Sequence, residues 1–155
     1  MSKRVLVVCI GNRLVGDDGV GPHVFDVLER DGVPDSVSLR LHETRGIALL
    51  DDLAGQDLLI AVDAVQLGKP PGTLHIRRGD RLGTGRRMPV TSHDVSLFET
   101  LAVCEVLYPE KLPASVLLIG VEGRDFNQLG ASLSSAVRNA IPAVVRAVKA
   151  ELDGC

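Results

Sequence analysis

The stretch Val5-Leu-Val-Val-Cys-Ile10 is a continuous apolar run that stops at Gly11-Asn12. A run rich in β-branched residues and bounded by a turn is typical of a strand that is buried on both faces. Two similar runs, Leu58 to Val62 and Val116 to Val121, predict further buried strands. Because both faces of such strands need covering, the three runs predict a parallel sheet packed between helices.

The rest of the chain alternates between strand and helix patterns. Shorter runs predict strands at Val37–Leu41 and Thr73–Ile76, and helical spacing predicts helices at Val20–Gly32, Ile47–Leu53, from Ser92 onward, and Leu133–Leu152. Pro142 is expected to kink or split the last helix. The Arg/Gly-rich stretch that follows the predicted strand Thr73–Ile76 and extends to Pro89 is expected to be a mobile surface loop.

This order of elements predicts an α/β fold. Strands alternating with helices and joined by right-handed crossovers give a three-layer α/β/α sandwich, with a mostly parallel twisted sheet of about five strands flanked by helices. The length of 155 residues predicts a single domain over 1–155.

Composition excludes several classes of protein. A net charge of −3 with only four aromatic residues (three Phe, one Tyr, no Trp) argues against nucleic-acid binding. No apolar run approaches the roughly 20 residues of a membrane span, so we expect no membrane insertion and read no signal peptide. The three cysteines, an odd number with no CxxC pair, suit a reduced cytoplasmic protein.

Polar residues collect where the predicted strands end. Asp17-Asp18 follows the first strand, Asp63 follows the third, and His93 opens a helix. Ligands of α/β folds bind at the carboxyl ends of the strands, so these groups can converge. Two carboxylates and an imidazole form a ligand set suited to a borderline divalent ion.

Each of these residues also has a structural interpretation. Asp17 or Asp18 can be the N-cap of the following helix. His93, taken alone, is as well explained as a solvated or capping residue. Asp63 is harder to explain in that way, because a carboxylate after a buried strand has no evident local cation.

Common catalytic motifs are missing from the sequence. There is no GxGxxG dinucleotide fingerprint after the first strand, so we expect no organic cofactor. The GxSxG elbow and the HExxH zinc helix are absent as well. Cys9, inside a buried strand, is not a nucleophile candidate.

Four blocks carry a resemblance to a known family. Gly11-Asn-Arg-Leu-Val-Gly-Asp-Asp-Gly-Val-Gly21 resembles the signature of the hydrogenase maturation endopeptidases. Ile60-Ala-Val-Asp63 with Pro-Gly-Thr73, Ser92-His93-Asp-Val-Ser-Leu97, and Ile119-Gly-Val-Glu122 are similar to the family's later blocks, in the same order. The resemblance covers nearly the whole chain.

The resemblance implies an endopeptidase of hydrogenase maturation. Its substrate would be the nickel-loaded large-subunit precursor of a nickel-iron hydrogenase, from which it removes a carboxy-terminal extension. It also implies that Asp18, Asp63 and His93 are the metal-binding and catalytic residues, and that the nickel comes from the precursor. We expect Asn12, Asp17 and Thr44 to contact the substrate, although Asp17 can instead be a cap or a support for the ligands.

The chemistry stays open at this stage. Nickel can polarise the scissile carbonyl or activate water, or it can only dock the substrate. A carboxylate, Asp17, Asp18 or Asp63, can equally serve as base without metal, as in an aspartic-type peptidase. The chain also departs from the family where many members have Asp-Gly-Gly-Thr, because it reads Leu41-His-Glu-Thr44, which we expect to affect the choice of precursor.

Two other functions share these features. A receiver-like signalling domain also has an acidic pair and a later aspartate, but it needs a lysine after its last strand, where this chain has Glu122-Gly-Arg124. A non-cleaving, metal-dependent binding protein would use the same metal-contacting residues.

Overall fold

The computed structural model describes residues 2–43, 47–80 and 95–155. Its sheet has five strands in the order β2-β1-β3-β5-β4. The first four of these run parallel, and β4 is antiparallel to β5 at one edge. The strands are β1 (Val5–Ile10), β2 (Val37–His42), β3 (Leu58–Val65), β4 (Leu74–Asp80) and β5 (Ser115–Glu122). The expected α/β class and mostly parallel sheet are confirmed.

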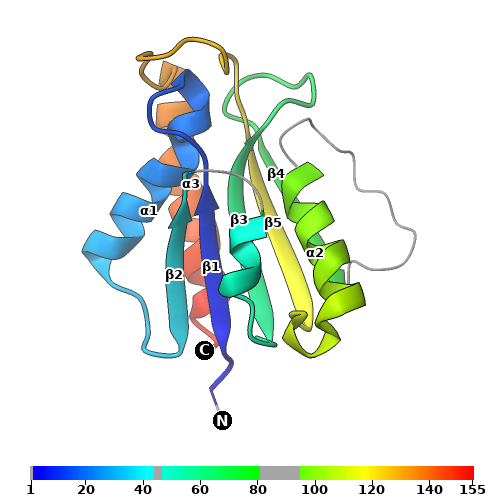
Figure 1. Cartoon of the computed structure of the whole chain (residues 1–155). Helices are drawn as coiled ribbons and strands as arrows, with labels where there is room; N and C mark the ends of the chain where they lie inside the picture. Colours follow the sequence, from blue (N-terminus) through cyan, green and yellow to red (C-terminus); the bar gives the residue numbers. More distant parts are fainter. Residues whose placement is uncertain (1, 44–46, 81–94) are drawn as a thin grey trace.

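Helices cover both faces of the sheet, so the three-layer prediction is also confirmed (Figure 1). On one face lie α1 and α3, which contact each other; on the other lie α2 and the 3₁₀ helix η2. The helices are α1 (Val20–Asp31), α2 (Val95–Leu107) and α3 (Ser135–Leu152), with 3₁₀ turns η1 (Gly16–Gly19), η2 (Ile47–Asp51) and η3 (Pro109–Lys111). Among the described residues, no helix is long and apolar enough to cross a membrane.

The two-residue period of the strands divides the core into two parts. Val5, Val7 and Cys9 of β1 face α1 and α3, whereas Leu6 and Val8 face α2 and η2. All six residues of β1 are buried. This two-sided burial is the physical reason why the first strand lacks polar positions.

Three expectations need correction. β3 was predicted to end at Val62 but continues to Val65, so Asp63 lies within the strand, opposite Gly120 of β5. β4 continues to Asp80, so Arg77 and Arg78 belong to a strand and not to a loop. The remainder of the predicted mobile loop, 81–89, lies outside the described residues.

The third correction concerns the last helix. Of the two outcomes expected at Pro142, a kink or a split, the split is wrong, because α3 runs continuously from Ser135 to Leu152. Proline removes one backbone donor and so costs one helical hydrogen bond. Buried residues on both sides of it, Val137 and Val144 among them, pack against the sheet and hold the two halves in one helix.

Candidate functional site

The candidate site lies where the strand order changes direction. From β1 the chain passes to β2 on one side, and β3 lies on the other side of β1. In open α/β sheets such a point leaves a crevice outside the carboxyl ends of the two central strands. The 3₁₀ turn η1, which follows β1 and carries Asp17 and Asp18, contacts β3, which carries Asp63. The fold therefore brings the first and second acidic blocks to one edge of the sheet.

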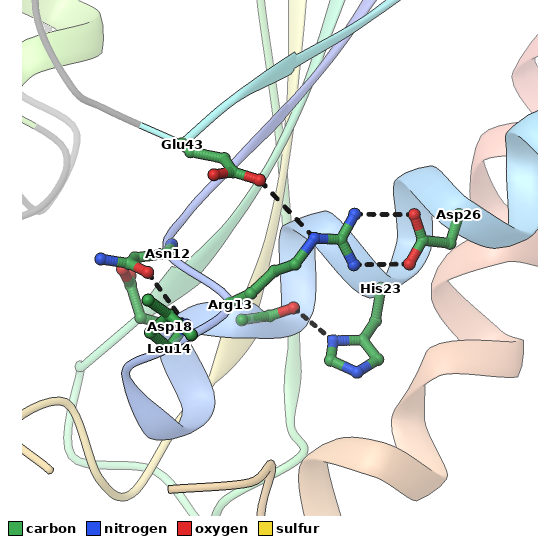
Figure 2. A network of polar contacts seen from close by, with 8 residues as sticks. Asn12, Arg13, Leu14, Asp18, His23, Asp26 and Glu43 are labelled. Carbon is green, nitrogen blue, oxygen red and sulfur yellow. Dashed lines mark hydrogen bonds and ion pairs between the residues drawn. The ribbon is translucent and has the colours of Figure 1, made fainter. Parts of the chain in front are cut away.

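Asp18 is held by the loop that precedes it. Its side chain is 7% exposed, and Oδ2 accepts a hydrogen bond from the backbone N–H of Asn12 at 2.9 Å. The Asn12 side chain accepts from the Leu14 N–H at 2.9 Å, which shapes the same turn (Figure 2). Gly11 has φ +145°, and a Cβ at that position would collide with the Asp18 carbonyl oxygen. A glycine is thus required for the turn that brings Asp18 back over the end of β1.

Asp63 is a carboxylate inside the sheet. It is 2% exposed, and its Oδ1 accepts from the N–H of Ala64 at 2.8 Å. Strand alternation turns it toward the same face as Leu59 and Ala61, which is the α2 face. Burial of a carboxylate costs free energy unless hydrogen bonds or charges compensate it, and the Ala64 N–H supplies one such hydrogen bond.

Asp17 has different surroundings from Asp18, although the two are adjacent in sequence. It is fully buried, and its carboxylate accepts hydrogen bonds from the N–H groups of Arg124 (2.7 Å), Asp125 (3.4 Å) and Ser134 (2.7 Å) and from the Ser134 hydroxyl (3.0 Å). The Asp17 carboxylate therefore binds both ends of the segment 124–134, which connects β5 to α3. These contacts favour the supporting role over the direct substrate contact that we also considered.

The N-cap interpretation of the acidic pair is wrong. Helix α1 has Gly19 at its N-cap position and no side-chain cap, and η1 has Val15 there, again without one. The carboxylates bond to other backbone donors instead. The sequence could not reveal this, because the donors to Asp17 lie more than 100 positions away.

Arg13 joins the same turn to the neighbouring elements. Its guanidinium donates to both oxygens of Asp26 in α1, at 2.5 and 2.7 Å, and its Nε lies 3.6 Å from Glu43 beyond β2 (Figure 2). The hydrogen bonds from Arg13 lower the pKa of Asp26, with the charge of Arg13 acting in the same direction. His23 accompanies this group, with Nδ1 2.8 Å from the carbonyl oxygen of Gly19.

Glu122 is a buried residue at the same edge that the sequence analysis did not assign a role. It is 1% exposed and accepts from the N–H groups of Leu67 (2.8 Å) and Lys69 (3.2 Å), while His75 Nε2 lies 3.1 Å from Oε1. It fastens the connection between β3 and β4. Its occurrence at the end of a buried apolar strand was the available signal, of the same kind that singled out Asp63.

Leu41 stands where many members of the resembled family have an aspartate. Leu41 lies within β2, opposite Cys9, and packs against the core on the α1 side. Its neighbour His42 is paired with Asp52, at 2.7 Å between Nε2 and Oδ2, and Glu43 is engaged with Arg13. His42 and Glu43, the two polar residues that follow Leu41, therefore already have partners within the protein.

Two of the predicted site residues, His93 and Thr44, lie outside the described residues. Across 2–43, 47–80 and 95–155, no cluster of three or more His, Cys, Asp or Glu side chains is arranged to hold a metal. The described part thus supplies two carboxylates of the expected ligand set. Cys9 is excluded as a nucleophile, since burial raises its pKa to about 12, with the charge of Asp26 adding to the effect.

Comparison with known proteins adds independent information. The family model described as hydrogenase maturation protease matches residues 25–151. The hydrogenase expression/formation protein HoxM of Azotobacter vinelandii is 35% identical over 149 residues, which span 94% of this chain and 70% of that protein. The hydrogenase 2 maturation protease of Escherichia coli is 31% identical over 120 residues, spanning 76% of this chain and 72% of that protein.

Solved structures show the same architecture. The hydrogenase maturating endopeptidase HybD from E. coli superimposes with a TM-score of 0.82 at 28% identity, covering 97% of this chain and 92% of that one. A hydrogenase 2 maturation peptidase from a Thaumarchaeota archaeon gives 0.73 at 35% identity, covering 97% and 98%. Both alignments extend over nearly all of the chain.

Proposed function

This chain belongs to the hydrogenase maturation protease family, and on that premise we propose that it removes a carboxy-terminal extension from the nickel-loaded large-subunit precursor of a nickel-iron hydrogenase. The observation that carries the proposal is the meeting of η1 and β3, with Asp18 and Asp63, at the switch point of the sheet. Membership in a family of peptidases excludes the receiver-like interpretation.

Nickel enters this proposal as part of the substrate. Asp18 and Asp63 offer carboxylate oxygens, and His93 would add an imidazole, a ligand better suited to nickel than to magnesium. The three residues together would leave positions open for the ligands that the precursor itself provides. Cleavage would then depend on whether the precursor has received its metal.

The two described carboxylates also limit the chemistry. A carboxylate with little exposure can take a proton from an attacking water, provided that it lies within hydrogen-bond reach of it. We propose that Asp18 and Asp63 bind and orient the nickel-bearing segment of the precursor, and that either one serves as base in an aspartic-type hydrolysis. The protein is proposed to act in the cytoplasm, in keeping with three unpaired cysteines, two of them buried.

The decisive experiment is intact mass spectrometry of the purified precursor, nickel-loaded and nickel-free, after incubation with this protein and no other protease. We expect the nickel-loaded form alone to lose a carboxy-terminal peptide. Tight binding of the nickel-loaded form without any mass loss would identify a non-cleaving binding protein instead. Equal cleavage of both forms would retain the peptidase and overturn nickel recognition.

A further inference from the structure

One buried carboxylate fastens both ends of a long surface loop. Asp17 accepts from Arg124 and Asp125 at the start of the segment 124–134 and from the N–H and hydroxyl of Ser134 at its end. This segment connects β5 to α3 and has little regular structure. A loop of that length would ordinarily be free to vary in conformation, and here a single side chain closes it at its base.

Backbone contacts then join this loop to the turn that carries Asp18. Three backbone N–H groups donate to backbone carbonyl oxygens across the two segments: Gly16 to Ala131 at 3.2 Å, Asp17 to Asp125 at 2.8 Å, and Gly130 to Leu14 at 2.5 Å. Gly16 has φ +47°, and a Cβ there would lie 2.5 Å from the Asp125 carbonyl oxygen. Only glycine permits so close an approach in that conformation. The segments 12–19 and 124–134 therefore behave as one unit.

This unit exposes two leucines beside the candidate site. Leu14 is 60% exposed and Leu129 is 79% exposed. Their backbones are neighbours, because Leu129 forms a β-bridge with Val15. The Val15 carbonyl in turn accepts the N–H of Asp18 at 3.0 Å. Neither leucine contributes to the core, although each is held by an ordered backbone.

We propose that Asp17 is a positioning residue, which fixes segment 124–134 so that Leu129, together with Leu14, contacts an apolar part of the precursor next to the bond to be cut. This inference rests on the proposed function, and its geometric basis is that Leu14 and Leu129 adjoin Val15, whose carbonyl accepts the N–H of Asp18. Asp17 itself touches no substrate. Its effect is on the recognition of the precursor and not on the chemical step.

The first test measures KM and kcat separately for the nickel-loaded precursor. Leu129→Ser is expected to raise KM about tenfold, the factor that burial of one leucine side chain typically supplies, with little change in kcat. Leu107→Ser is the control, since Leu107 is also largely exposed (61%, against 79% for Leu129) but lies at the end of α2. An unchanged KM for Leu129→Ser, or an equal rise for Leu107→Ser, would overturn the proposal.

The second test asks whether Asp17 acts through Leu129. Asp17→Asn is expected to raise KM, and adding Leu129→Ser to it should raise KM no further, because the leucine is already misplaced. If Asp17→Asn is poorly folded, Ser134→Ala removes one of the four hydrogen bonds and should give a smaller rise of the same kind. A fall in kcat at constant KM would make Asp17 part of the chemistry and would contradict the proposal.

Affinity separates this inference from the proposed function. Binding of the nickel-loaded precursor can be titrated whether or not it is cut. If wild-type protein binds the precursor without cleaving it, the proposed function fails. Weaker binding by Leu129→Ser than by wild type, with normal binding by Leu107→Ser, would still support the contact. If wild-type protein cleaves and Leu129→Ser binds the nickel-loaded precursor as tightly as wild type, the proposed function stands and the contact is refuted.

Discussion

Arg13 and Asp26 form a bidentate ion pair, in which Nη1 of the guanidinium donates to Oδ2 of the carboxylate at 2.5 Å and Nη2 donates to Oδ1 at 2.7 Å. The pair ties the turn after β1 to the middle of α1 (Figure 2). Asn12 and Asp18 belong to the same turn, so the pairing of Arg13 with α1 helps to fix the position of the candidate site.

Loss of this ion pair should appear as a change in the acid sensitivity of the protein. The pKa of Asp26 is lowered from 3.8 in the folded state by hydrogen bonds from Arg13. A lowered pKa stabilises the fold above about pH 4, and this contribution is lost as the pH falls through the folded-state value. Asp26→Asn should therefore lower the free energy of unfolding at pH 7 by about 0.5–1 kcal/mol, and the difference from wild type should vanish at low pH. Urea titrations between pH 2 and 7 measure it, with exposed Glu29→Gln on the same helix as control.

Replacing a residue of the candidate site should strongly reduce cleavage without unfolding the protein. Asp63→Asn, Asp18→Asn and His93→Ala should each reduce cleavage of the precursor about 100-fold or more. Asp35→Asn, an exposed aspartate before β2, should cleave normally. Circular dichroism checks the fold of each variant. Wild-type processing by the Asp63 and His93 variants would remove the site assignment.

Glu122 should matter for stability more than for chemistry. It holds the N–H groups of Leu67 and Lys69 and faces His75 in a nearly dry environment. In Glu122→Gln an amide NH₂ replaces one acceptor oxygen and meets other donors, which should cost about 2 kcal/mol. Thermal unfolding would show a lowered Tm, whereas Glu110→Gln, on the exposed turn η3, should leave Tm unchanged. A Tm equal to wild type would show that the β3–β4 connection is held by other contacts.

The three cysteines should differ in reactivity toward thiol reagents. Cys9 and Cys104 are fully buried, and desolvation raises the pKa of both thiols, that of Cys9 to about 12. Cys155 is only half-buried. Native protein at pH 8 should therefore be modified at one thiol, and unfolded protein at three, since the thiolate is the reactive species. Peptide mapping after alkylation identifies the sites, and rapid labelling of Cys9 in the native state would contradict its placement in the sheet.

Local pattern was a good guide to most elements, and its failures share one cause. The buried run at β1 had the right bounds because every position in it is apolar. At β3 the apolar pattern stopped at Val62, yet pairing with β5 continued through Asp63 to Val65. At α3 the helix continued through Pro142 because packing on both sides of it outweighs one missing hydrogen bond. In each case a tertiary contact overrode the local signal.

The sequence by itself determined the α/β class, the family and the acidic residues at the strand ends, since hydrophobic period and residue type are local properties of the chain. The resemblance already separates the adjacent aspartates, because it implies that Asp18 is the ligand and Asp17 a substrate contact, a cap or a support. Only the tertiary structure decided what each carboxylate is bonded to: Asp17 accepts from Arg124 and Ser134, and Asp18 accepts from Asn12. The physical reason is that hydrogen-bond partners of a buried carboxylate come from whatever chain is nearby in space. For Asp17 that chain lies more than 100 residues away in sequence.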